Sequence, residues 1–226
     1  MAKKQGIVYH PPREYNWRGE GYFTIQGVVD RGETTTYVVA PKMTPGLNQD
    51  KLAELYEREK QAENPHPTSA PLLQTIINRA YVIRNVNPQD SERFRVFLQN
   101  GLRRYPHTLT RITFNPEGQL DQVTHNHGTS DAYSIEGNIV GPDGWMVEIP
   151  DKKVLESLTG TKRVSQINRT YQWINKTNGY LWRLNSKPTQ KDERVARFDA
   201  GHDRFFLCCG RHPLYVCPAF RVLRVE

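Results

Sequence analysis

The carboxy-terminal stretch from Tyr180 to Glu226 constrains the fold more than any other part of the chain. It begins with Tyr180–Pro188, a run rich in strand formers that ends on a proline. It closes with Pro218–Val225, in which apolar residues form a second short strand-like run beside two arginines. Between them, Ala200–Cys217 shows neither a helical nor a strand period and contains all 3 cysteines of the chain. The pattern predicts two framework strands around a segment that follows no secondary-structure rule.

The middle segment is too apolar for an ordinary solvated connection, because loops normally run polar over the surface. Two interpretations stay open for its apolar residues. They complete the core, or they form an exposed patch whose side chains anchor a partner, as binding hot spots do. The residues concerned are Phe205, Phe206, Leu207 and Val216.

The order of motifs in this region resembles the carboxy-terminal part of a C-type-lectin-fold domain. The motifs are Leu181–Ser186, Arg194–Phe198, the irregular segment, and Ala219–Val222. The branch it resembles is shared by formylglycine-generating enzymes and by the variable proteins of diversity-generating retroelements, which include archaeal variable proteins. In variable proteins, mutagenesis directed at adenines turns Asn codons into many others and spares the framework codons. The residues reachable in this way include much of what stands between Asp199 and Cys217.

The resemblance implies an α+β fold of the C-type-lectin type, with small antiparallel sheets, a few helices, long irregular loops and joined chain ends. It implies a single domain over residues 1–226, with a variable ligand-binding region at about 182–226. Framework strands are expected to bury Trp182, Leu184, Phe198, Phe220 and Val222. Residues expected to face the ligand, with Phe206 and Tyr215 as apolar anchors, are Asp199, His202, Asp203, Phe206, Cys208, Gly210, His212, Leu214, Tyr215 and Cys217.

The enzymatic members of this branch provide a contrast. By resemblance, those oxidases place a reactive cysteine pair near the segment that here reads Lys191–Phe198, which contains no cysteine. The sequence therefore predicts a non-enzymatic protein that binds a variable macromolecular ligand, a protein in our interpretation, without a cofactor. Calcium dependence is not expected of this branch, and the acids near the segment do not make a convincing set of oxygen ligands.

The cysteines and histidines suggest two metal sites, neither of which the spacing supports. Cys208 and Cys209 are adjacent, so on an extended chain they point in opposite directions and would rarely bind one tetrahedral zinc ion. The tripeptide His125-Asn126-His127 invites comparison with His-Asn-His nucleases. No following helix carries a metal ligand at suitable spacing, however. A basic nucleic-acid-binding protein or such a nuclease remains the alternative function.

The charge and composition of the chain bear on its partners and on its cellular compartment. The formal net charge of +7 permits contact with nucleic acid, but Lys and Arg are spread along the chain among acidic residues, so specific nucleic-acid binding is not expected. An odd number of cysteines does not make a disulfide framework, and a reducing compartment is expected. No apolar run approaches a membrane span, and no apolar segment follows the basic start as a secretory signal requires. Cytoplasmic synthesis, with or without surface or virion display through a partner, fits the sequence, and oligomeric state stays open.

The rest of the sequence predicts a mixture of strands and helices. Tyr22–Val29 and Thr34–Val39 form a hairpin, Thr108–Phe114 and Gln122–His125 form another, and His66 lies in a linker-like break. Leu72–Val82 fits either a helix or a buried strand. Helices are predicted at Lys51–Glu63 (capped by Asn48 or Asp50), Gln89–Arg104, Asp151–Leu158 (ending at Gly160) and Arg163–Asn175.

Overall fold

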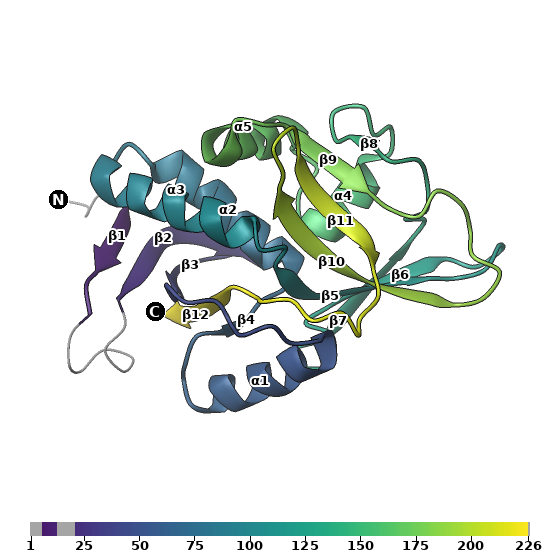
Figure 1. The fold of residues 1–226 in the computed structure, drawn as a ribbon, viewed down its shortest axis with the longest axis horizontal. Helices are drawn as coiled ribbons and strands as arrows, with labels where there is room; N and C mark the ends of the chain where they lie inside the picture. The colour runs from purple at the N-terminus through teal and green to yellow at the C-terminus, as the bar shows by residue number, and fades with distance from the viewer. Residues whose placement is uncertain (1–5, 13–20, 226) are drawn as a thin grey trace.

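The computed structural model describes residues 6–12 and 21–225 of the chain. These residues form a five-stranded sheet, a seven-stranded sheet and five helices (Figure 1). The α+β class expected from the sequence is confirmed. The larger hydrophobic cluster takes its side chains from both sheets and from helices α2 to α5, so one core lies between the layers.

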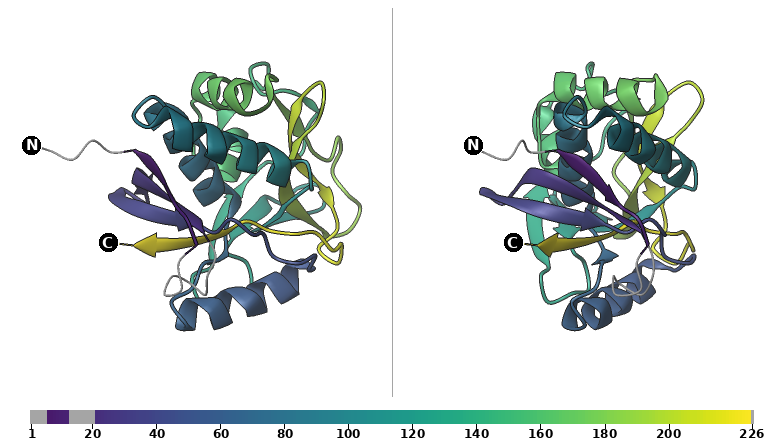
Figure 2. Two further views of the ribbon diagram at one scale, coloured as in Figure 1. Left: turned by 60° about the vertical axis from the view of Figure 1, so that its left-hand side comes forward. Right: turned by 90° about the vertical axis from the view of Figure 1, so that its left-hand side faces the viewer.

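The five-stranded sheet joins the two ends of the described chain. Its strand order is β1-β2-β3-β12-β4, and its members are β1 (Ile7–His10), β2 (Tyr22–Asp30), β3 (Glu33–Val39), β4 (His66–Pro67) and β12 (Arg221–Val225). The expected hairpin is formed by β2 and β3. Strand β12 runs antiparallel to β3 and places Val222 beside Val39 (Figure 2). His66, expected in a linker, instead pairs with Val222 in this sheet.

Helices α2 (Ala70–Ile83) and α3 (Pro88–Leu102) lie over the five-stranded sheet (Figures 1 and 2). The ambiguous segment is therefore helical. Helix α2 is buried on several sides, so its apolar residues do not form a narrow stripe. Helices α4 (Lys152–Thr159) and α5 (Val164–Asn175) also pack against α2. Helix α4 ends as predicted at Gly160, whose φ of 72° is a left-handed cap that suits glycine.

The seven-stranded sheet carries the region that the sequence marks as functional. Its order is β7-β6-β5-β10-β11-β9-β8. Its members are β5 (His107–Phe114), β6 (Asp121–His125), β7 (Tyr133–Gly137), β8 (Gly144–Trp145), β9 (Gly179–Trp182), β10 (Asp192–Ala200) and β11 (Phe205–Arg211). All neighbours are antiparallel except β9 and β11, which run parallel. Strand β10 begins with the acidic residues Asp192 and Glu193.

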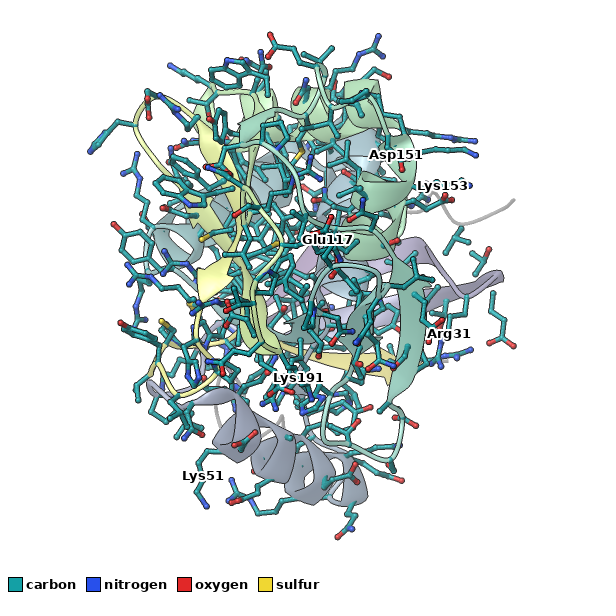
Figure 3. All side chains as sticks on the ribbon, turned by 90° about the vertical axis from the view of Figure 1, so that its right-hand side faces the viewer. Arg31, Lys51, Glu117, Asp151, Lys153 and Lys191 are labelled. Atoms are coloured by element: carbon teal, nitrogen blue, oxygen red, sulfur yellow. The ribbon has the colours of Figure 1, made fainter. Side chains whose placement is uncertain are left out.

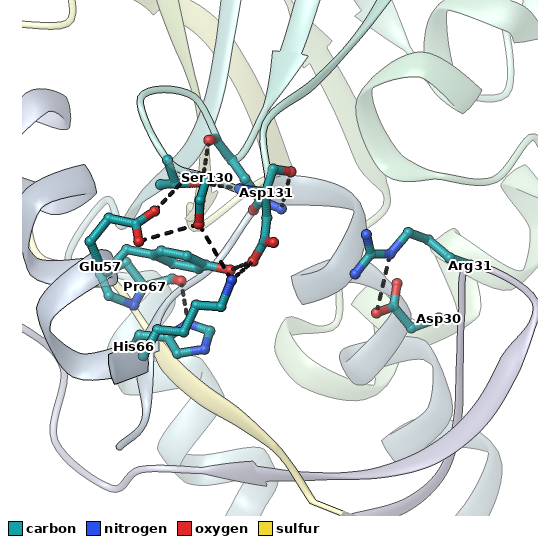
Figure 4. Close-up of polar contacts among 11 residues, drawn as sticks. Asp30, Arg31, Glu57, His66, Pro67, Ser130 and Asp131 are labelled. Carbon is teal, nitrogen blue, oxygen red and sulfur yellow. Dashed lines mark hydrogen bonds and ion pairs between the residues drawn. The ribbon is translucent and has the colours of Figure 1, made fainter. Parts of the chain in front are cut away.

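Helix α1 (Gln49–Gln61) lies apart from the other helices and is held to the turn between β6 and β7 by polar contacts (Figure 4). The Lys60 Nζ atom donates to Asp131 Oδ2 at 2.6 Å, and the Tyr56 hydroxyl donates to the same carboxylate. Glu57 accepts hydrogen bonds from the backbone N–H and the hydroxyl of Ser130. These bonds fix the loop that follows the His125–His127 tripeptide.

The first turn of α1 depends on a side-chain cap. The Asn48 Oδ1 atom accepts a hydrogen bond from the Lys51 backbone N–H at 2.9 Å. We expect Asn48→Ala to lower the free energy of unfolding by about 1 kcal/mol, because an exposed helix N-terminus loses a hydrogen-bond partner. Urea unfolding measures this difference. Asn48→Asp keeps an acceptor and is expected to change stability by less than about half as much; equal losses in both variants would contradict this role of Asn48.

Candidate ligand-binding site

The segment that looked irregular in sequence contains a regular strand, β11, with two different faces. Phe205, Leu207 and Cys209 are fully buried in the core. The intervening residues Phe206, Cys208 and Gly210 point to the opposite side, where they line a surface pocket. The expectation of no strand period in this segment is wrong for 205–211. The alternation is hidden because both faces carry apolar side chains.

Strand register arranges the outward side chains in rows across the sheet. Phe206 lies beside Tyr180 of β9 and Asp199 of β10. In the next row, Cys208 lies beside Trp182 and Arg197. Since side chains two residues apart share a face of a sheet, these rows form one outward surface. Figure 3 shows this side of the molecule, where side chains project outward from the yellow strands, above Lys191 and the helix that carries Lys51.

The outward surface is hollowed by a pocket of about 410 Å³. Seven residues of β9, β10 and β11 line it, and four of them are in the set that the sequence assigned to the ligand. The lining residues are Trp182, Arg197, Asp199, Phe206, Cys208, Gly210 and Arg211. Gly210 has no side chain, so the space beside Trp182 stays open. A Cβ atom at this position would lie 3.7 Å from the indole ring, in ordinary van der Waals contact. The pocket is large enough for one bulky side chain of a ligand.

A group of aromatic rings continues this surface along β9 towards β8. The Phe206 ring lies 5.9 Å from Trp182 and 5.7 Å from Tyr180, and Tyr180 lies 5.3 Å from Trp145. The guanidinium of Arg204 stands over the Tyr180 ring at 4.8 Å. Such amphipathic rings supply large contact areas at little cost in side-chain entropy, which is why they recur in binding hot spots.

Two arginines flank the pocket on its other side. The Arg197 guanidinium lies 5.1 Å from the centre of the Tyr105 ring, and Arg211 lies 5.1 Å from that of Tyr215. The Arg197 guanidinium also lies beside Cys217. Burial raises the pKa of the Cys217 thiol, and the nearby arginines oppose that shift. Burial likewise raises the pKa of Asp199, against the opposing charge of Arg197.

The remaining expected site residues lie at the two ends of the pocket. His202 and Asp203 are exposed in the β10–β11 turn, where the Asp203 carboxylate pairs with Arg204. His212, Leu214 and Tyr215 are exposed in the loop after β11. Leu214 is 63% exposed and Tyr215 is 53% exposed. Cys217 is partly buried and forms an isolated bridge with Leu47 that ties the end of this loop to the chain ahead of α1. Two expected residues of this loop contact the pocket lining, Tyr215 through Arg211 and Cys217 through Arg197.

One residue expected in the core of the framework, Trp182, lies on the outward face of the sheet instead. Trp182 was expected in the core, but it is 50% exposed and forms a wall of the pocket. Its neighbour Arg183 is buried instead. The guanidinium of Arg183 donates to the carbonyls of Ile139 at 3.0 Å and Pro142 at 3.2 Å. Leu184 is only partly buried, whereas Phe198, Phe220 and Val222 are in the core as expected.

Sequence reasoning missed several residues of this surface. They were Tyr180, Trp182, Arg197, Arg204, Arg211, and Trp145 from a distant segment. The spacing between Arg197 and Asp199 could have identified Arg197, because residues two positions apart on a strand lie on the same face of the sheet. No comparable signal marks Trp145, which joins this surface through the pairing of β8 with β9.

The histidine tripeptide is built into the scaffold. His125 is buried, and its Nδ1 atom lies 2.9 Å from the Thr110 hydroxyl. The acid that follows, Asp131, is engaged by Tyr56 and Lys60 of α1 (Figure 4). Over residues 6–12 and 21–225, no group of three or more His, Cys, Asp or Glu side chains is arranged to hold a metal ion.

Two buried histidines predict a pH-dependent stability. Burial lowers the pKa of His107 to about 4, with the charges of Arg197 and Arg211 acting in the same direction, and burial also lowers the pKa of His125 to about 4. Unfolded imidazoles titrate near pH 6.5, so the unfolded chain binds more protons between about pH 6.5 and 4, and stability falls as the pH falls through this window. We expect each histidine to contribute a loss of about 1 kcal/mol between pH 7.5 and 5.5.

Urea unfolding at the two pH values measures this loss. His107→Gln is expected to reduce the pH dependence, whereas the same change at the exposed His202 is expected to leave it as it is. A pH dependence that is identical in the wild type and in His107→Gln would show that burial of His107 does not matter.

Within the described part of the chain, no helix is both long and apolar enough to cross a lipid bilayer. Comparisons of the chain with family models, curated proteins and solved structures found no match.

Proposed function

We propose that this chain is a non-enzymatic binding protein that takes a macromolecular ligand on the outward face of β9, β11 and β10. In this proposal it is a variable protein of a diversity-generating retroelement with a C-type-lectin-like fold. The ligand surface comprises the pocket and the adjoining loop 212–217. We call this surface the variable face.

The observation that carries the proposal is the alternation of core-facing and outward-facing residues along β11. Fully buried Phe205, Leu207 and Cys209 hold the strand in the core, whereas Phe206 and Gly210 open onto the pocket and Cys208, itself buried, lies in its wall. Exposed substitutions away from packing features usually change stability by less than about 0.5 kcal/mol, while an anchor in an interface can change binding by several kcal/mol. A surface with this layout can vary without loss of the fold.

The fold supports the proposal at a coarser level. The resemblance implies a domain whose amino-terminal and carboxy-terminal strands meet in a small sheet, and β12 pairs with β3 in this way. The motifs that carry the resemblance fall on or beside β9, β10 and β12; β9 and β10 carry the variable face together with β11, and β12 lies in the five-stranded sheet. The residues between those motifs supply β11 and the exposed loop.

A display experiment tests the proposal. One library of the full chain randomises the outward positions Phe206, Cys208, Gly210, His212, Leu214 and Tyr215. A second library randomises six exposed positions elsewhere, namely Val29, Val82, Val86, Val96, Leu120 and Val147. Both are sorted for protease resistance and then for binding to one folded target protein, such as lysozyme.

We expect most clones of the first library to remain protease-resistant and this library to yield binders at least about tenfold more often than the second, because its positions line a pocket or lie in the loop beside it. Binders arising equally often from both libraries would contradict a dedicated face. Loss of protease resistance in most clones of the first library would also contradict the proposal, because the face would then be part of the stabilising framework.

A further inference from the structure

We propose that the variable face, as it stands in this chain, selects an acidic segment of a protein ligand. A carboxylate of that segment would be received between Arg197 and Arg211, and an adjacent apolar side chain would lie against Trp182 and Phe206. This inference rests on the proposed function and adds the chemistry of the partner.

The charges around the pocket are unbalanced. Two arginines and one aspartate line it, which leaves an excess of one positive charge. Neither Arg197 nor Arg211 forms an ion pair with a carboxylate of the described residues, whereas Arg194 and Arg204 on the same strands and turn do. An arginine fork without a carboxylate partner is suited to bind one, because its N–H groups match the two carboxylate oxygens.

Ring contacts restrict both arginines in the absence of a ligand. The Arg197 guanidinium lies 5.1 Å from the centre of the Tyr105 ring, and the Arg211 guanidinium lies 5.1 Å from that of Tyr215, which are cation–π distances. A preorganised fork loses less side-chain entropy when it binds. The pocket therefore presents two held cations beside an aromatic wall formed by Trp182 and Phe206.

Two features favour a protein segment over a nucleic acid. Asp199 lines the pocket, so a phosphate placed there would meet a negative charge. The adjoining loop exposes Leu214 and Val216, each 63% exposed. Exposed aliphatic side chains of this kind pack against the apolar side chains of a protein ligand.

The test uses a phage-displayed library of random 12-residue peptides selected on the immobilised full chain. Selected peptides are then measured by fluorescence anisotropy against three proteins: the wild type, Arg197→Gln/Arg211→Gln, and Lys153→Gln/Lys162→Gln. The last variant removes the same number of positive charges at exposed sites on and just after α4. Circular dichroism melts check that both variants remain folded.

We expect selected peptides to be enriched in Asp and Glu beside Leu, Phe or Trp. They are expected to bind Arg197→Gln/Arg211→Gln at least about tenfold more weakly and to bind Lys153→Gln/Lys162→Gln as the wild type does, because a carboxylate loses its charge-assisted bonds only in the first variant. No acidic enrichment, or equal binding to the arginine variant, overturns the inference.

The outcome also separates this inference from the proposed function. Peptides that lose binding to Trp182→Ala but keep it with Arg197→Gln/Arg211→Gln would retain the variable face as the binding site and reject the acidic partner. Peptides that bind Trp182→Ala and Arg197→Gln/Arg211→Gln with the same affinity as the wild type would contradict the proposed function as well. A fluorescent 20-nucleotide oligothymidylate serves as a further probe. Salt-sensitive binding that is lost in the arginine variant, without acidic peptides, would identify a nucleic-acid ligand and overturn the inference.

Discussion

Phe205→Ala is expected to lower the free energy of unfolding by about 3–5 kcal/mol, because removing a buried aromatic ring loses its packing and leaves a cavity. The Phe205 side chain is fully buried, stacks on Tyr171 with ring centroids 3.7 Å apart, and also contacts Phe198. Denaturant unfolding followed by circular dichroism measures the loss. A change of this size would make Phe205 one of the main supports of the variable face from beneath.

Its neighbour Phe206 supplies the matched control. Phe206→Ala removes the same ring from the opposite side of the same strand, where it contacts Tyr180 and Trp182 at the surface. We expect a loss of about 1 kcal/mol or less, because the site stays open to solvent and no closed cavity is left. Similar losses in the two variants would mean that β11 does not separate a supporting face from a binding face.

Trp182→Ala is expected to weaken the binding of ligands selected on the variable face by about 30-fold to 1,000-fold, which corresponds to about 2–4 kcal/mol. Trp182 forms a wall of the pocket, contacts Phe206, and is already half exposed, so its loss removes an anchor without opening the core. Surface plasmon resonance with an immobilised ligand from the display selection measures the change.

Tyr133→Ala is the control for this prediction. Tyr133 is an exposed aromatic residue on β7, at the other edge of the seven-stranded sheet, so its removal is expected to leave ligand affinity within about twofold of the wild type. Equal weakening by the two variants would mean that ligands do not use the pocket. Unchanged affinity in Trp182→Ala would exclude this residue as an anchor.

Much of the framework could be predicted from the sequence because its elements obey simple rules. The β2–β3 hairpin has strand formers on both sides of a glycine-containing turn, and α1 begins after the capping Asn48. Helix α2 stayed ambiguous for a physical reason. Its residues meet β2, α4 and α5, so apolar side chains appear on several sides and the helical period weakens.

The candidate site was harder to predict because its faces depend on tertiary pairing. Sequence rules bury a tryptophan and expose the arginine beside it, yet Trp182 is exposed and Arg183 is buried. The inversion is possible because backbone carbonyls of Ile139 and Pro142, distant in sequence, accept hydrogen bonds from the Arg183 side chain. Four expected residues still fell on the pocket, because Asp199, Phe206, Cys208 and Gly210 lie on adjacent strands with matched register.

The central claim is that outward positions of one rigid sheet are diversified while the positions beneath them are kept. The DNA beside the gene tests it most directly. Sequencing is expected to reveal a reverse-transcriptase gene and a near-copy of the codons from Asp199 to Leu223 that differs only where the copy has adenine. The differences are expected at outward codons such as those of Phe206, Gly210 and Tyr215, and not at those of Phe205 or Leu207. No such copy, or differences gathered at the buried codons, would contradict the account.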